Sequence, residues 1–375
     1  MAMRVIIAGG GSGGHLFPGL ALARELTEKD GVNVLFVGAE KGIESRIVPK
    51  SGFQIKFLPA EGVMGKSAPA KIKAVYKMAV SFFKARGLMA SFRPDVVIGT
   101  GGYASFSPVL AAWSCQIPSL IMEQNVAPGA ANKLLARVAG AVAVTYQESM
   151  PYFPRAKSFL TGNPVRKEIL DAKRSNASFE TFGLAPDLFT VFVFGGSSGA
   201  RAINSALIGA LEHLLDLKQD IQFLHQSGES DYQGVREAYR RTGFRAMVAP
   251  FVFQMPEAYA ASDLVISRAG ATTLAELTAL GKPAILIPYP YAGEHQDANA
   301  RKLEGVGAAM LIRERELSAE ALAANIRLLM EDENIRNGMS SQSRVIGKPD
   351  AARSVADIAL SLVRMNNVSR KARNV

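Results

Sequence analysis

Arg4-Val-Ile-Ile-Ala8 followed by Gly9-Gly-Gly-Ser-Gly-Gly14 opens the chain, and Thr190-Val-Phe-Val-Phe194 followed by Gly195-Gly-Ser-Ser-Gly199 repeats the pattern half a chain later. In each copy a short apolar strand runs into a glycine loop, and a helix-like sequence follows the loop. Such a loop leaves backbone N–H groups pointing outward at the positive end of a helix dipole, which suits phosphate. Two copies predict an α/β protein with two Rossmann-like, doubly wound parallel-sheet domains that face each other across a cleft.

Apolar runs alternate with helical stretches through both halves of the chain. The other expected strands cover 33–37, 95–100, 118–122, 141–145, 221–225, 246–250, 263–267, 284–288 and 308–312. Nearly continuous apolar strands between helices indicate parallel sheets that are covered on both faces. Turn residues from Thr161 to Arg166 predict a linker. We therefore expect an N-terminal domain over 1–162 and a C-terminal domain over 163–349, then a helix and basic tail over 350–375 that pack back on the first domain.

Composition limits the class of protein. The 375 residues exceed what one core usually supports, so two domains are the default expectation. A hydrophobic content of 48% with 20% charged residues is typical of a soluble globular chain. The single Cys115 excludes an internal disulfide framework and fits a reducing compartment. Because the apolar stretches are too short for a membrane span or a secretory signal, we expect a cytoplasmic protein.

The net charge of +10 comes mainly from two stretches. Residues 62–94 hold seven basic side chains and no acidic one, and the tail after Asp357 is also free of acids. A nucleic-acid surface would fit the charge, but these stretches lack any helix-turn-helix, zinc-ligand or RNP-type pattern. We therefore expect no nucleic-acid partner.

Apolar side chains alternate with the cations between Lys71 and Phe92. Their spacing is helical, so an amphipathic helix that faces the core is one interpretation. The other is contact with an anionic membrane surface, since each cation near the leaflet adds about 1 kcal/mol. The residues expected at such a surface are Ile72, Lys73, Val75, Lys77, Phe82 and Lys84. Trp113 fits either this surface or the core.

The first glycine loop satisfies G-x-G-x-x-G between a strand and a helix. This is the dinucleotide fingerprint, so a nicotinamide-dependent oxidoreductase is a rival reading. That class needs an acidic residue after the second strand to bind the ribose. Glu40 lies near that position, but we interpret it as a surface glutamate. His15 stands where that class begins an apolar helix. An imidazole at a helix N-terminus favours its neutral form, which suits a general base, although a hydrogen-bonded structural histidine and a ligand-free turn stay open.

Polar residues follow two more strands of the first half. Gly99-Thr-Gly-Gly-Tyr-Ala-Ser105 and Glu123-Gln-Asn125 should lie at the same edge of the sheet as the first loop. Turn chemistry explains either segment alone, but three loops at one edge favour a binding site.

The second half has a comparable edge. Ser267-Arg-Ala-Gly-Ala-Thr-Thr-Leu-Ala-Glu276 runs from a strand into a helix, and its small residues leave room for phosphate or ribose. Glu276 could accept hydrogen bonds from a ribose diol, or it could lie on a solvated helix face. No metal site is predicted, because His295 and Asp297 form an incomplete ligand set.

Taken together, these motifs resemble the MurG family of bacterial glycosyltransferases. The match runs in order through Gly9 to His15 with Pro18, 101–103, 123–125, 162–166, 195–201, 268–276 and Gln296 with 299–300, and so spans nearly the whole chain. Two departures are Ser12, where threonine is frequent, and His295, where some members carry a second glutamine. The resemblance implies a GT-B fold with UDP-GlcNAc held mainly by the C-terminal domain.

The resemblance also implies a role for particular residues. His15 would be the catalytic base. Donor contacts would come from Ser12, Gly13, Gly14, Asn125, Arg166, Ser197, Val252, Ala271, Thr272, Thr273, Leu274, Ala275, Glu276 and Gln296. Within that set, the backbone near Val252 would read uracil, Glu276 would hold the ribose and Gln296 the sugar hydroxyls. The acceptor pyrophosphate would lie at Gly11, Gly101, Gly102 and Tyr103.

The activity implied is inverting transfer of GlcNAc to the C4 hydroxyl of MurNAc in undecaprenyl-pyrophosphoryl-MurNAc-pentapeptide, which turns lipid I into lipid II for peptidoglycan. No cofactor or metal would be required. The expected location is the cytoplasmic face of the bacterial inner membrane. Other cell-wall synthesis proteins are an open possibility as partners there. Two rivals remain: the oxidoreductase, which would leave the second loop unused, and a non-enzymatic nucleotide sensor at the membrane.

Overall fold

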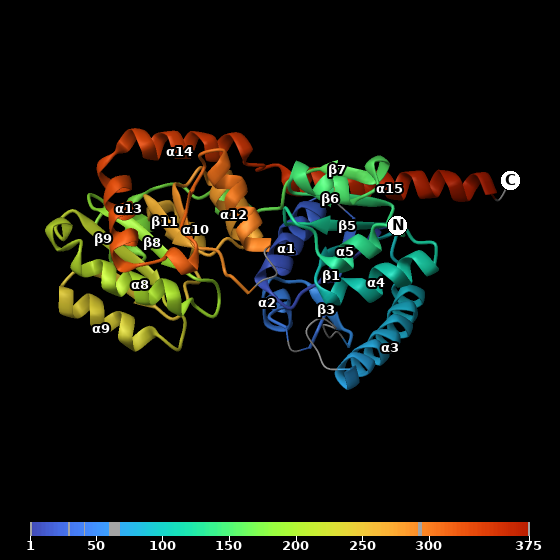
Figure 1. Ribbon diagram of the computed structural model, residues 1–375. Coiled ribbons are helices and arrows are strands. Elements are labelled where there is room, and N and C mark those ends of the chain that lie inside the picture. Colours follow the sequence, from blue (N-terminus) through green and yellow to red (C-terminus); the bar gives the residue numbers. More distant parts are fainter. Residues whose placement is uncertain (1, 29–30, 41, 60–67, 292–294, 374–375) are drawn as a thin grey trace. The chain divides into compact units, whose positions relative to one another are not determined.

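The computed structural model describes residues 2–28, 31–40, 42–59, 68–291 and 295–373, with the backbone alone for 68–75 and 369–373. The chain forms two compact units (Figure 1). Unit 1 comprises Met1–Arg166 and Lys348–Val375, and unit 2 comprises Lys167–Gly347.

Unit 1 is built on a parallel sheet with helices on both faces. Its strands are β1 (Met3–Gly9), β2 (Val32–Gly38), β3 (Gln54–Phe57), β4 (Val96–Gly101), β5 (Ser119–Glu123), β6 (Ala141–Val144) and β7 (Ser158–Leu160). They lie in the order β3-β2-β1-β4-β5-β6-β7, and every neighbouring pair is parallel. The helices are α1 (Gly13–Thr27), α2 (Glu44–Lys50), α3 (Ala68–Phe92), α4 (Tyr103–Ser114), α5 (Ala130–Leu135) and α15 (Ala351–Arg373), with short 3-10 turns η1 (Gln147–Tyr152) and η2 (Arg155–Lys157).

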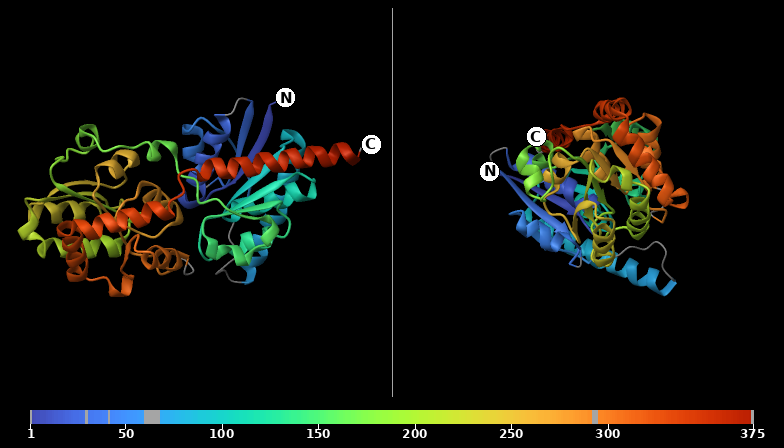
Figure 2. Two further views of the ribbon diagram at one scale, coloured as in Figure 1. Left: turned by 90° about the horizontal axis from the view of Figure 1, so that it is seen from above. Right: turned by 90° about the vertical axis from the view of Figure 1, so that its left-hand side faces the viewer.

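The strand residues of unit 1 alternate between two apolar layers. Val5 and Ile7 of β1 pack with α1 and α2 on one face, whereas Ile6 and Ala8 pack with α3, α4 and α5 on the other. The final helix, α15, belongs to the first of these layers, where its residues Val355, Ala356 and Ala359 are fully buried. Figure 2 shows α15 running across the sheet. The last segment of the chain thus completes the core of the first unit.

Unit 2 repeats the plan with a six-stranded parallel sheet. Its strands are β8 (Phe189–Phe194), β9 (Ile221–Gln226), β10 (Arg245–Ala249), β11 (Leu264–Ser267), β12 (Ala284–Leu286) and β13 (Met310–Leu311), in the order β10-β9-β8-β11-β12-β13. Its helices are α6 (Lys167–Leu170), α7 (Asn176–Glu180), α8 (Arg201–Glu212), α9 (Tyr232–Thr242), α10 (Met255–Ala261), α11 (Ala271–Leu280), α12 (His295–Gly305), α13 (Ala319–Glu331) and α14 (Glu333–Ile346), with η3 (Leu215–Leu217) and η4 (Glu314–Glu316).

The strands of unit 2 are also buried on both sides. Val191 and Val193 of β8 pack with α8, α9 and α13. Phe192 faces the other way, and its ring lies 5.8 Å from that of Tyr259 on α10 in an edge-on contact. The doubly wound parallel sheets expected from the sequence are therefore confirmed in both units.

The strand order reverses once in each sheet, at β1 and β4 in unit 1 and at β8 and β11 in unit 2. In open α/β sheets, ligands bind beyond the carboxyl ends of the strands at such a reversal. The glycine loops after β1 and β8 both lie at such a reversal. These two sheet edges are therefore the candidate binding sites. Among the described residues, no helix has the length and apolar character needed to cross a membrane.

Candidate functional site

A bulge in β4 places a carbonyl group against His15. Ala8 pairs with Gly99 but Gly9 pairs with Gly101, so Thr100 is an extra residue in β4. Bulges of this kind redirect groups out of the ladder. The carbonyl oxygen of Thr100 lies 3.1 Å from Nδ1 of His15 and accepts a second hydrogen bond, of 2.7 Å, from Nε2 of Gln124. Because a carbonyl oxygen only accepts, Nδ1 of His15 must carry a proton.

The environment of His15 keeps its imidazole neutral. Burial lowers the pKa of His15 below its ordinary 6.5, although the charge of Glu123 and the hydrogen bond to Thr100 oppose this shift. With Nδ1 protonated and the ring neutral, Nε2 holds the free lone pair. His15 also lies in the first turn of α1, which has no acidic residue there to offset the positive helix end. The arrangement makes Nε2 a proton acceptor at neutral pH.

Two glycines of β4 and its loop make room for this imidazole. A Cβ atom on Gly101 would lie 2.6 Å from Nδ1 of His15, and one on Gly102 would lie 3.1 Å from its Cδ2. Both glycines also have positive φ angles, +104° and +71°. Side chains at these positions would displace the ring and strain the backbone. These residues were expected at the acceptor pyrophosphate, and the structure adds that they make room for the His15 ring.

A buried carboxylate shapes the first glycine loop. Glu44 at the start of α2 is fully buried and accepts hydrogen bonds of 2.9 Å from the N–H groups of Gly11 and Ala39. A Cβ on Gly10 or Gly42 would collide with this carboxylate. The N–H of Gly11 is therefore used inside the protein, so any contact of this loop with pyrophosphate falls to other groups. Sequence reasoning missed Glu44, because its partner in the glycine loop, Gly11, lies 33 residues away along the chain.

The hydroxyl of Ser12 faces outward at the start of α1. Ser12 occupies the N-cap position with an extended backbone, yet its side chain makes no capping hydrogen bond, and the residue is exposed. Gly13 and Gly14 follow it in the first turn of the helix. The positive end of the α1 dipole therefore lies beside the exposed Ser12.

Glu123 organises the loop after β5. It is buried, and its Oε1 accepts from the N–H of Asn125 at 3.0 Å and from Nδ2 of the same residue at 3.2 Å. Its Oε2 accepts from the N–H of Gly129 and from Nδ2 of Asn132. These bonds fix the side-chain amide of Asn125.

Tyr103, at the start of α4, is half exposed.

Arg166 lies at the end of unit 1 beside α1. Its guanidinium carbon is 4.4 Å from the centre of the Phe17 ring. Phe17 follows His15 by two residues in α1, so this cation lies beside the first turns of the helix. The structure thus brings His15, Arg166 and the loops after β1, β4 and β5 together at one edge of unit 1.

The matching edge of unit 2 carries the second glycine loop and the loop after β10. Gly196, Ser197 and Ser198 are exposed, and Gly199 packs so closely on Ser227 that a Cβ there would collide with the Ser227 carbonyl. Val252, after β10, is buried, and its N–H donates to Oε1 of Gln226 at 2.9 Å. Within the protein the Val252 N–H therefore already has an acceptor.

Helix α11 presents its N-terminus at the same edge. Its N-cap is Gly270, its first turn has no acidic residue, and it runs for ten residues from Ala271. The expected contacts Thr272, Thr273, Leu274 and Ala275 all lie in its first half. Glu276 is only 4% exposed, and its Oε2 accepts from the hydroxyl of Tyr259 at 2.8 Å. The alternative of a solvated helix face for Glu276 is therefore wrong.

The loop after β12 is braced from two sides. Oε1 of Gln296 accepts from the N–H of Tyr289 at 2.9 Å. Arg268 donates to the carbonyls of Ile287 and Pro288, and forms an ion pair of 2.6 Å with Glu314. Arg268 thus links the carboxyl ends of β11 and β12. Among the residues that the structure describes, no three His, Cys, Asp or Glu side chains are grouped as metal ligands.

Comparison with known proteins identifies the family of this chain. The glycosyltransferase family 28 N-terminal domain matches residues 5–144, and the C-terminal domain of that family matches 190–357. The chain is 49% identical to the UDP-N-acetylglucosamine--N-acetylmuramyl-(pentapeptide) pyrophosphoryl-undecaprenol N-acetylglucosamine transferase of Thermodesulfovibrio yellowstonii, over 96% of this chain and 99% of the relative. The chain belongs to the MurG family of glycosyltransferases.

Two further relatives extend the comparison. The enzyme of the same description from Myxococcus xanthus is 44% identical over 96% of this chain and 93% of its own. The crystal structure of MurG from Acinetobacter baumannii superposes with a TM-score of 0.74 at 29% identity, covering 96% of this chain and 99% of that one. The GT-B fold expected from the sequence is thus confirmed, and the chain is a glycosyltransferase.

Helix α3 divides its side chains between core and solvent. Ala85 and Met89 are buried and Phe82 packs partly against them, so the core-facing interpretation holds for this half of the helix. Phe82 is therefore poorly placed for the membrane contact expected of it. Outward on α3 lie Phe83, which is 70% exposed, and Lys84. The side chains of Ile72, Lys73 and Val75 lie outside the described residues.

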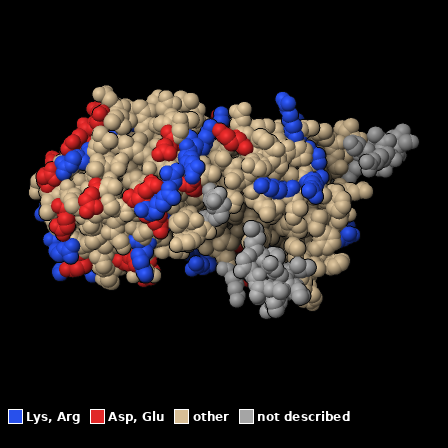
Figure 3. Space-filling view, in the orientation of Figure 1, with Lys and Arg blue, Asp and Glu red and all other residues tan. Residues whose placement is uncertain are grey.

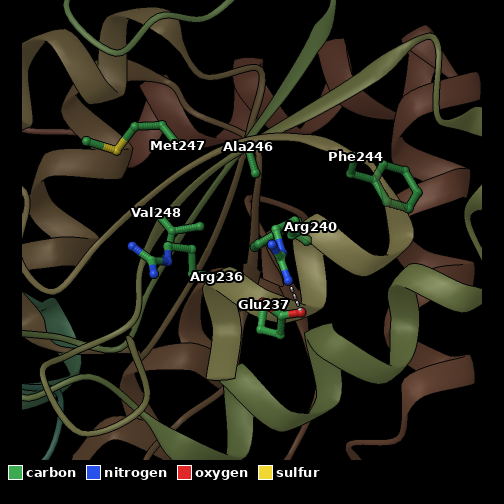
Figure 4. A pocket seen from close by; sticks show the side chains of 8 residues that line it. Arg236, Glu237, Arg240, Phe244, Ala246, Met247 and Val248 are labelled. Carbon is green, nitrogen blue, oxygen red and sulfur yellow. Dashed lines mark hydrogen bonds and ion pairs between the residues drawn. The ribbon is translucent and has the colours of Figure 1, made fainter. Parts of the chain in front are cut away.

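One further pocket of unit 2 lies between α9 and β10. A cavity of about 730 Å³ is lined by Arg236, Glu237, Tyr239, Arg240, Phe244, Ala246, Met247 and Val248. In Figure 4 these side chains come from α9 and from β10 with the turn before it, and Arg240 pairs with Glu237. None of the site residues expected from the sequence lines this cavity. The cavity is therefore not part of the candidate site.

Proposed function

We propose that this protein transfers N-acetylglucosamine from UDP-GlcNAc to the C4 hydroxyl of MurNAc in undecaprenyl-pyrophosphoryl-MurNAc-pentapeptide. The observation that carries the proposal is the imidazole of His15, with Nδ1 held by the Thr100 carbonyl at a strand-order reversal. The names of the relatives give this donor, this acceptor and the transfer of N-acetylglucosamine. The rival oxidoreductase gives no role to the second glycine loop or to α11.

In the proposed reaction Nε2 of His15 takes the proton of the C4 hydroxyl as its oxygen attacks C1 of GlcNAc. The new C1–O bond forms on the face opposite UDP, the bond to UDP breaks, and UDP leaves with the electron pair. The configuration at C1 is therefore inverted. General-base help of this kind contributes about 10²- to 10⁴-fold in rate.

Unit 2 is proposed to hold the donor. The N-terminus of α11 would receive the diphosphate, with the hydroxyl of Ser197 as a further contact. Ser12 and Arg166 of unit 1 stay predicted donor contacts from the family resemblance. Glu276 would accept from the ribose hydroxyls, and Tyr259 would keep its carboxylate in place. Gln296 would contact the sugar. Because helix ends and an arginine stabilise the leaving diphosphate, we propose that no metal ion is needed.

Unit 1 is proposed to hold lipid I at the cytoplasmic face of the inner membrane, with the pyrophosphate near Gly102 and Tyr103. Tyr76, Phe83 and Trp113 are 69%, 70% and 55% exposed, and they lie on the packed helices α3 and α4. Arg86 on α3 donates to Ser114 beside Trp113, which adds a cation to this pair of helices. Figure 3 shows few acidic side chains on the drawn face of unit 1. Such a surface suits an anionic leaflet.

An assay with competing substrates tests the proposal. The purified protein is mixed with labelled UDP-GlcNAc, NADH and a soluble lipid I analogue, and all products are identified by mass and NMR. We expect one β-linked GlcNAc per acceptor and one UDP released. Oxidation of NADH would favour the oxidoreductase, and nucleotide binding without turnover would favour a sensor; either result would overturn the proposal.

A further inference from the structure

The side chain of Gln226 joins two loops that the proposed donor site needs. Gln226 is the last residue of β9 and is only 3% exposed. Its Nε2 donates to the carbonyl of Gly196 at 2.8 Å, and its Oε1 accepts from the N–H of Val252 at 2.9 Å. One carboxamide therefore ties the glycine loop after β8 to the loop after β10, on either side of its own strand.

Neither loop is held in this way by regular structure. The Gly195–Gly199 segment follows the end of β8 and has glycines at φ +100° and +77°. Val252 lies three residues beyond the last residue of β10. Strand pairing between β8, β9 and β10 ends at Phe194, Gln226 and Ala249. Beyond that edge the N–H of Gly228 donates to the Pro250 carbonyl at 3.1 Å, and the two hydrogen bonds of Gln226 tie the Gly196 carbonyl to the Val252 N–H.

We propose that Gln226 is a positioning residue for the donor nucleotide, an inference that rests on the proposed function. It sets the distance between Ser197, expected at the diphosphate, and the Val252 backbone, expected at the uracil. Glutamine suits this task because its amide donates on one side and accepts on the other. A carboxylate would repel the Gly196 carbonyl. An apolar side chain would remove the acceptor of the Val252 N–H and leave the Gly196 carbonyl with the N–H of Gly199 alone, at 3.1 Å.

The same strand offers a matched control. Gln222 is fully buried four residues earlier in β9, on the same face. Its Oε1 accepts from the N–H of Ala185 at 2.9 Å, and its Nε2 donates to the Ala185 carbonyl and to the Thr190 hydroxyl. Gln222 thus makes an equally satisfied bridge at the opposite end of the sheet, away from the donor edge.

The test compares Gln226→Met, Gln226→Glu and Gln222→Met in the full chain. Dissociation constants for UDP and for UDP-GlcNAc are measured by calorimetry, and kcat and donor KM in the transfer assay. We expect both Gln226 variants to raise the UDP dissociation constant and donor KM about tenfold with kcat changed less than about threefold. Gln226→Met loses both hydrogen bonds, whereas Gln226→Glu loses the one to the Gly196 carbonyl and places a charge against that oxygen. Gln222→Met should lower stability and leave UDP affinity within about twofold.

Amide hydrogen exchange gives a readout that needs no ligand. In Gln226→Met the Val252 N–H should exchange faster than in wild type and in Gln222→Met, because its acceptor is gone. Equal UDP affinity in the Gln226 and Gln222 variants, with a wild type that binds UDP, would overturn this inference alone. A wild type that binds no UDP at all would overturn the proposed donor, and the inference with it.

Discussion

The Nδ1 atom of His15 lies 3.1 Å from the carbonyl oxygen of Thr100, and this contact decides which imidazole nitrogen can take a proton. The carbonyl is available because Thr100 is the extra residue in the β4 bulge. Nε2 is left as the basic atom, at the start of a helix whose dipole disfavours the imidazolium form. The bulge in β4 thus determines which nitrogen of His15 can accept a proton.

The rate of transfer should depend on pH through this imidazole. Burial lowers the pKa of His15 below 6.5, so the neutral base persists into mildly acidic solution. As pH falls through this lowered pKa, Nε2 becomes protonated and cannot accept the proton of the acceptor. We expect kcat/KM to fall on the acid side with a midpoint below 6.5. A midpoint at or above that value in a pH series would contradict a buried, neutral His15.

Gly101→Ala should displace the imidazole of His15. The added Cβ would meet Nδ1 of His15 at 2.6 Å, at a backbone φ of +104°. We expect a loss of about 1–3 kcal/mol in the free energy of unfolding and a larger fractional fall in kcat than in donor affinity. Gly87→Ala is the matched control, because its Cβ would meet nothing within 4 Å on α3. That variant should gain about 0.5–1 kcal/mol and retain full kcat. Equal kcat in the two variants would contradict this displacement of the His15 ring.

Glu276→Gln should weaken nucleotide binding. The buried carboxylate of Glu276 is held by Tyr259, and a neutral amide is a poorer acceptor for two ribose hydroxyls. We expect the UDP dissociation constant to rise by about 10- to 100-fold, with a smaller rise for Tyr259→Phe. Calorimetric titration with UDP measures both. Unchanged UDP affinity in Glu276→Gln would remove the ribose role from this residue.

Membrane attachment should depend on the outward face of α3. Phe83→Ser together with Lys84→Glu removes one exposed aromatic side chain and reverses one charge. We expect the partition coefficient onto vesicles with anionic lipid to fall by at least about tenfold, from the cation and buried apolar area lost. Arg240→Glu, at a side chain 79% exposed on α9 of unit 2, reverses a charge elsewhere. If both variants bind vesicles equally well, α3 is not the contact surface.

Most of the fold could be predicted from the sequence, because buried parallel strands have nearly continuous apolar sequences. Strands β1, β2, β4, β5 and β6 were all expected, as were those of unit 2. The short edge strands β3 and β7 were missed, since Gln54–Phe57 is largely exposed and Ser158–Leu160 spans three residues. Neither segment has the apolar pattern that identifies a buried strand.

Interactions between distant residues could not be read from the chain. Glu44 lies 33 residues from Gly11, and Gln226 lies 26 residues from Val252, so no local motif reveals these bonds. The glycine pattern predicted where the loops begin, whereas buried side chains from other elements decide which loop N–H groups are already used. The tautomer of His15 likewise depends on a bulge that no periodicity shows.

The kinetics of His15→Ala test the central claim most directly. Initial rates with UDP-GlcNAc and a soluble lipid I analogue are measured at neutral pH for wild type and variant. The account predicts that kcat falls about 10²- to 10⁴-fold while donor KM changes less than about threefold, because the base acts in the transition state. A variant with nearly normal kcat and a strongly raised donor KM would contradict it and make His15 a binding residue.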